Sequence, residues 1–114
     1  MNAGFELKNL TDMGSKLSQL YKHRLEPGDQ VYLKTLNSVY VIKVVKADEY
    51  FVSGGWFDRQ NLSPCKINIR GCTWGGTAIK TDIIAAPGLC IEFGNNLITS
   101  TINKVFYFSY KSNN

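Results

Sequence analysis

The sequence predicts a mainly β fold of the α+β type, in which an N-terminal helix precedes a strongly bent antiparallel sheet or small β-barrel of about seven or eight strands. Two observations favour this fold. An apolar stripe with helical spacing occupies residues 9–24, and short β-branched or aromatic runs separated by turn residues fill residues 30–110. The 114 residues are expected to form a single domain, with residues 1–8 as a tail.

The helix is expected over residues 9–24 because apolar side chains recur there at steps of three and four. The stripe consists of Leu10, Met13, Leu17, Leu20, Tyr21 and Arg24. Lys22 and His23 also stand in the last turn, where positive charge favours the negative end of the helix dipole. Gly14 weakens such a helix by about 1 kcal/mol relative to alanine, so we expect the helix to depend on packing against the β region.

Turn residues divide the rest of the chain into strands. Pro27 and Gly28 predict a type II turn, Gly54 and Gly55 a bulge or sharp bend, and residues 94–96 a hairpin turn. The expected strands are residues 30–34, 39–46, 50–53, 66–70, 78–85, 89–93, 97–102 and 105–110. Apolar side chains occupy both faces of the last strand, so both faces are expected to be covered.

Two tryptophan–diglycine clusters bracket residues 51–76 and predict a ligand site. Trp56 follows Gly54-Gly55, and Trp74 precedes Gly75-Gly76. An indole offers a flat face, and Arg59 and Arg70 stand near the two tryptophans in sequence. Arginine beside tryptophan occurs in structural contacts and in pockets for planar ligands. Both tryptophans are equally compatible with core positions at the corners of a barrel.

The sequence lacks recognisable enzyme and metal motifs. It contains no nucleophile elbow, P-loop or dinucleotide fingerprint, and its single histidine, His23, has no partner indicated by spacing. Cys65, Cys72 and Cys90 lack the two-to-four-residue gaps of zinc knuckles. We therefore expect reduced, structural thiols, no metal and no cofactor, and an enzyme is the least favoured class of function.

Two resemblances accompany these patterns. The segment Leu25-Glu26-Pro27-Gly28-Asp29-Gln30-Val31 resembles the turn into the first strand of SH3-like small barrels. The whole layout, a short helix followed by a glycine-punctuated β domain, resembles the orphan single-domain proteins carried on bacterial integron gene cassettes. The second resemblance implies a small oligomer and assigns no site residue.

The leading functional hypothesis is non-catalytic binding of a small molecule or a protein in an aromatic cleft formed by Trp56, Arg59, Arg70 and Trp74. The alternative is nucleic-acid binding by a small barrel, through exposed tyrosines and the cations Lys43, Lys46, Lys66 and Arg70. A net charge of +4 is compatible with both hypotheses.

Partners and location are also predicted from composition. Only 19% of the residues are charged, which favours a homodimer with Phe106 or Phe108 as the anchor of its interface. The N-terminus has no signal-peptide pattern and no apolar run reaches membrane-spanning length. We therefore expect a cytoplasmic protein without a membrane partner.

Overall fold

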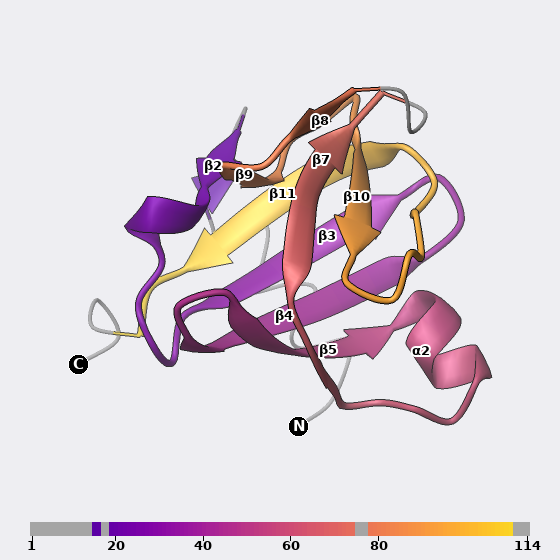
Figure 1. Ribbon diagram of the computed structural model, residues 1–114, viewed down its shortest axis with the longest axis horizontal. Coiled ribbons are helices and arrows are strands. Elements are labelled where there is room, and N and C mark those ends of the chain that lie inside the picture. Colours follow the sequence, from indigo (N-terminus) through magenta and orange to yellow (C-terminus); the bar gives the residue numbers. More distant parts are fainter. Residues whose placement is uncertain (1–14, 17–18, 75–77, 111–114) are drawn as a thin grey trace.

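The computed structural model describes residues 15–16, 19–74 and 78–110, and this part of the chain is mostly β structure (Figure 1). The strands are β1 (Ser15–Lys16), β2 (Leu20–Tyr21), β3 (Gln30–Thr35), β4 (Val39–Lys46), β5 (Glu49–Gly54), β6 (Cys65–Ile67), β7 (Ile69–Thr73), β8 (Ile79–Lys80), β9 (Ile83–Ala85), β10 (Cys90–Phe93) and β11 (Ile102–Phe108). A 3-10 turn, η1 (Lys22–Arg24), and a short helix, α2 (Gly55–Arg59), complete the described elements.

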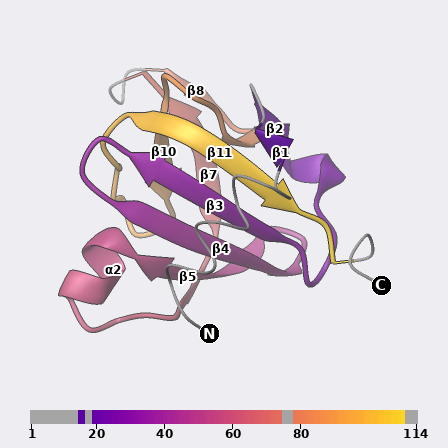
Figure 2. The ribbon, with the colours of Figure 1, turned by 180° about the vertical axis from the view of Figure 1, so that it is seen from behind.

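The strands form three antiparallel sheets that pack in layers. The largest has six strands in the order β1-β11-β3-β4-β5-β6, the second has the order β10-β7-β8, and β2 pairs with β9. In Figure 1 the β10-β7-β8 sheet lies in front of the six-stranded sheet. Figure 2 shows the molecule from behind, with β11, β3, β4 and β5 nearest the viewer. One face of the large sheet is therefore covered by the smaller sheet and the other points outward.

The structure corrects the predicted N-terminal helix. Within residues 9–24, β1 pairs with β11 and β2 pairs with β9, while η1 is a single 3-10 turn. Residues 9–14 and 17–18 of the expected helix, and the tail at residues 1–8, lie outside the described residues. Leu20 is fully buried, so this apolar residue fills the core from a strand. The spacing of three and four therefore did not distinguish a helix from short strands, one of which contributes an apolar side chain to the core.

The predicted single bent sheet or barrel is also wrong. In the described part of the chain β1 and β6 each pair with one neighbour, so the six-stranded sheet is open at both ends. The expected strand at residues 66–70 breaks at Asn68, and its halves join different sheets: β6 pairs with β5, and β7 pairs with β10. The chain changes layer at this break, and two packed sheets replace the closed barrel.

The core lies between the large sheet and the strands that face it. Buried residues alternate along β3, β4 and β5 with the period of two that a half-covered strand requires. The large sheet contributes Val31, Leu33, Tyr40, Ile42, Val44, Tyr50 and Val52, and the opposite layer contributes Ile69, Cys72, Ile83, Ile84, Ala85, Ile91 and Phe93. This arrangement leaves the intervening residues of β3, β4 and β5 on the outer face.

The diglycine at residues 54–55 turns the chain from β5 into α2. Gly54 has a φ of 94° and Gly55 a φ of 43°. A Cβ atom on Gly54 would lie 2.1 Å from the carbonyl oxygen of Val39. The sharp bend predicted here is confirmed, and it places Phe57 of α2 in the core against Phe93, with ring centroids 5.1 Å apart.

Candidate functional site

The structure distributes the four residues of the predicted aromatic cleft over two regions. Trp56 and Arg59 belong to α2, whereas Arg70 lies on β7 and Trp74 directly follows it. Figure 1 shows α2 at the lower right and the end of β7 that pairs with β8 at the top, and Figure 2 shows the same separation from behind. The contacts of the four side chains, described next, are correspondingly separate.

Trp56 and Arg59 make contacts local to α2. The Trp56 indole is half-buried and packs edge-on against Phe57, with ring centroids 5.3 Å apart. Its backbone N–H donates to the Tyr40 hydroxyl at 3.3 Å. Arg59 Nη1 donates to Ser38 Oγ at 3.3 Å. These contacts attach α2 to the large sheet.

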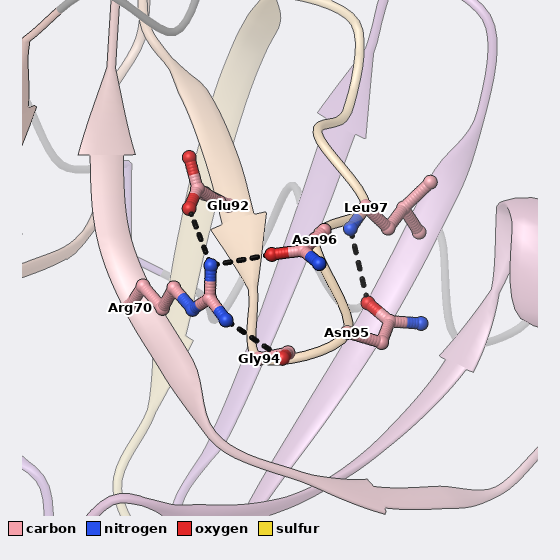
Figure 3. Close-up of polar contacts among 6 residues, drawn as sticks. All are labelled: Arg70, Glu92, Gly94, Asn95, Asn96 and Leu97. Carbon is pink, nitrogen blue, oxygen red and sulfur yellow. Dashed lines mark hydrogen bonds and ion pairs between the residues drawn. The ribbon is translucent and has the colours of Figure 1, made fainter.

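Arg70 connects β7 to β10 and to the turn after β10 through an ion pair and hydrogen bonds (Figure 3). Its Nη1 atom forms an ion pair with Glu92 at 3.1 Å and donates to the side-chain oxygen of Asn96. Its Nη2 atom donates to the carbonyl oxygen of Gly94 at 3.2 Å. The guanidinium is thus directed at β10 and the turn that follows it. Further along the same chain segment, Trp74 is 52% exposed and its ring lies 5.3 Å from Lys80 Nζ, a cation–π contact.

The three thiols are free, with Cys72 buried and the other two half-buried. Burial raises the pKa of Cys72 to about 12, so its nucleophilic thiolate is scarce at neutral pH. His23 lies in η1, with its ring centroid 5.5 Å from that of Tyr21. No group of three or more potential metal ligands occurs among residues 15–16, 19–74 and 78–110.

Aromatic and lysine side chains gather on the outer face of the six-stranded sheet, the side seen in Figure 2. Residues paired across antiparallel strands share a face, so the strand register defines rows on it. The rows are Lys104, Lys34 and Val39; Phe106, Tyr32, Val41 and Ser53; and Phe108, Gln30, Lys43, Phe51 and Lys66. We call this surface, with its aromatic residues Tyr32, Phe51, Phe106 and Phe108 and its lysines Lys34, Lys43, Lys66 and Lys104, the basic aromatic face.

Among the described residues, lysines clearly outnumber acidic side chains on this face. Together with Lys46 and Glu49 at the β4–β5 hairpin, it holds five lysines and one glutamate, a formal charge of +4. The whole chain also has a formal charge of +4, so its remaining eight basic and eight acidic side chains cancel. The basic aromatic face is therefore the part of the molecule best suited to an anionic partner.

Glu49 is already neutralised by neighbouring lysines. Lys66 Nζ lies 3.2 Å and Lys46 Nζ 3.3 Å from its carboxylate oxygens. The hydrogen bond from Lys66 is the main reason why the pKa of Glu49 lies below its usual value. Lys34, Lys43 and Lys104 form no hydrogen bond or ion pair within the described part of the chain and are exposed. Their ammonium groups are available to a bound anion.

Aromatic rings lie between these cations. Phe51 is 37% exposed and pairs in register with Lys43 on one side and Lys66 on the other. Tyr32 and Phe108 are half-buried and pack edge to face, with centroids 5.6 Å apart. A hollow of about 320 Å³ adjoins Phe51 and is lined by Gln30, Val41, Lys43, Phe51, Ser53 and Pro64.

Sequence reasoning identified part of this face. Lys43 and Lys66 were expected to contact nucleic acid, and Phe106 and Phe108 to line an interface. Tyr32, Phe51, Lys34 and Lys104 were not recognised. The available signal was the alternation in residues 30–34, where Tyr32 and Lys34 interleave with apolar residues. These alternating residues form one surface because their strands lie side by side in the sheet. The order of the strands is known only from the structure.

Comparison of the chain with protein-family models, with curated proteins and with solved structures finds no match in any of the three. No helix among the described residues is long and apolar enough to cross a membrane.

Proposed function

We propose that this protein is a non-catalytic binding protein whose basic aromatic face binds single-stranded nucleic acid. The observation that carries the proposal is the register that interleaves Tyr32, Phe51, Phe106 and Phe108 with four lysines on one side of a sheet. Lysines that contact phosphates and aromatic rings that stack on bases are the two components of single-strand recognition.

The aromatic component favours a single strand over a duplex. A duplex buries the faces of its bases in its own stack, whereas an unpaired strand presents them to a protein surface. Phe51 is exposed in the middle of a lysine-flanked row. A duplex would use the lysines of this face and leave that ring without a partner.

The competing occupant of the face is a second copy of the chain, as the expected homodimer requires. A two-fold interface brings the same patch of both subunits together. In a two-fold dimer formed through the basic aromatic face, a surface of formal charge +4 would lie against an identical surface. Like charges across an interface are unfavourable. Charge complementarity therefore supports a polyanion over a second copy.

The first test is the binding of a fluorescently labelled oligothymidylate, measured by anisotropy over a range of salt concentrations. We expect the logarithm of the association constant to fall linearly with the logarithm of salt concentration. Lys34→Gln and Lys104→Gln should each make this slope shallower by about 0.7, the value for one phosphate contact on a single strand.

Lys80→Gln is the matched control, because Lys80 is an exposed lysine on β8, in the three-stranded sheet and outside the basic aromatic face. It should leave both the affinity and the slope unchanged. Absence of binding at low salt contradicts the proposal. Equal losses of oligonucleotide affinity in Lys80→Gln and Lys34→Gln also contradict the proposal. They would show that the oligonucleotide is attracted to the net charge of the protein and not to one face.

A further inference from the structure

The hollow beside Phe51 lies within the basic aromatic face and has the composition of a small ligand pocket. Its walls come from three adjacent strands and the segment before β6. Val41, Phe51 and Pro64 make it mostly apolar, while Gln30 and Ser53 are its neutral polar residues. A mostly apolar wall with a few polar groups is typical of sites for planar organic ligands, and about 320 Å³ is at the small end of their range.

We infer that this hollow is a subsite for a single nucleobase, an inference that rests on the proposed function. Phe51 provides an exposed ring against which a base can stack. The Gln30 amide both donates and accepts hydrogen bonds, as does the Ser53 hydroxyl, and neither side chain has a hydrogen-bond partner in the described part of the chain. These two groups are placed to read the edge of the stacked base.

The cations around the hollow fix where the phosphate would lie. Lys43 lines the hollow and pairs in register with Phe51, and Lys66 follows on the next strand. A base stacked on Phe51 thus has Lys43 on one side and, on the other, Lys66, whose ammonium group also pairs with Glu49. The subsite should recognise a base and its own phosphate together, so a mononucleotide is the smallest ligand expected to bind.

The inference is tested by titrating the protein with nucleoside 5′-monophosphates while recording amide resonances by NMR. Saturable shifts are expected at the backbone amides of Phe51 and Ser53 and at the side-chain amide of Gln30. Ribose 5-phosphate, which carries the same phosphate without a base, should shift these resonances much less. Equal shifts from both ligands would show an anion site only and would overturn the base subsite.

Two variants test whether the ring of Phe51 itself holds the base. Phe51→Leu keeps an apolar side chain without an aromatic face and should weaken mononucleotide binding about fivefold or more. Trp74→Leu removes an exposed aromatic ring that lies outside the basic aromatic face and should leave mononucleotide binding unchanged. Unchanged mononucleotide affinity in Phe51→Leu contradicts the inference.

The oligonucleotide experiment distinguishes failure of the subsite from failure of the proposed function. If the oligonucleotide binds with the expected salt dependence but no mononucleotide shifts the three resonances, the base subsite is wrong and the proposed function stands. If neither ligand binds, both proposals are wrong.

Discussion

The buried Asp29 side chain links two segments that are far apart in the sequence. Asp29 is 1% exposed. Its carboxylate accepts hydrogen bonds from the Tyr107 hydroxyl at 2.7 Å and from the backbone N–H groups of Tyr110 and Glu26, both at 2.9 Å. The pKa of Tyr107 is raised, first by burial and then by this hydrogen bond, which the neutral phenol donates. Asp29 thus joins the turn before β3 to the end of β11.

Asp29→Ala is expected to lower the free energy of unfolding by about 2–3 kcal/mol, because it removes a charged acceptor and leaves buried donors without a partner. Urea denaturation measures the loss. Asp82→Ala is the control, since the exposed Asp82 side chain makes no hydrogen bond within the described residues and should change stability by less than about 0.5 kcal/mol. A loss in Asp29→Ala no greater than in Asp82→Ala would contradict the structural role of Asp29.

Among the elements, the corner between β5 and α2 shows how glycine shapes the molecule. Gly54 combines a φ of 94° with a ψ of −179°, a region that is nearly restricted to glycine. The backbone of Val39 on β4 also stands too close for a side chain there. The corner directs Phe57 inward, where it packs against Tyr40 and Phe93.

Gly54→Ala should therefore destabilise the protein through both backbone conformation and steric overlap. Gly88→Ala separates the two effects, because Gly88 has a similar φ of 89° but no atom within 4 Å of the added methyl group. We expect about 1–2 kcal/mol for Gly88→Ala and about 1–3 kcal/mol more for Gly54→Ala. Thermal or urea unfolding gives both values, and equal losses would show that the approach of Val39 is not limiting.

At the scale of the whole molecule, the described residues of the other two sheets cover only one face of the six-stranded sheet. The smaller sheet covers the inner side of β3, β4 and β5, and the basic aromatic face is the other side. Nucleic acid and a second copy of the chain would compete for this surface. Salt acts on the two in opposite directions, because it weakens attraction to phosphates and screens repulsion between lysines.

Self-association through this face should strengthen as salt rises from about 0.05 M to about 0.5 M, while oligonucleotide binding weakens. Sedimentation velocity at both salt concentrations should give a mass near 12.8 kDa at low salt and move towards twice that value at high salt. Phe106→Ser should prevent the shift by removing the proposed anchor. A dimer that weakens with salt would show that oppositely charged surfaces meet, which places the interface elsewhere.

The sequence by itself determined features that depend on neighbouring residues. The strand at residues 39–46, the bend at Gly54-Gly55 and the turn after Phe93 all agree with the structure, because alternation and glycine conformation act over a few residues. Lys43 and Lys66, two of the four cations predicted to contact nucleic acid, lie in the same row of the sheet, and their role in binding stays a prediction.

Tertiary structure decided the features that depend on which segments meet. Leu20 lies in the core on β2, which pairs with β9, although the spacing of the apolar residues around it fits a helix. The chain changes sheets at Asn68, although residues 66–70 alternate as one strand. Phe51 is on the candidate site because β5 lies between Lys43 on β4 and Lys66 on β6. Such a surface is assembled from distant segments by long-range strand pairing, which local sequence patterns do not specify.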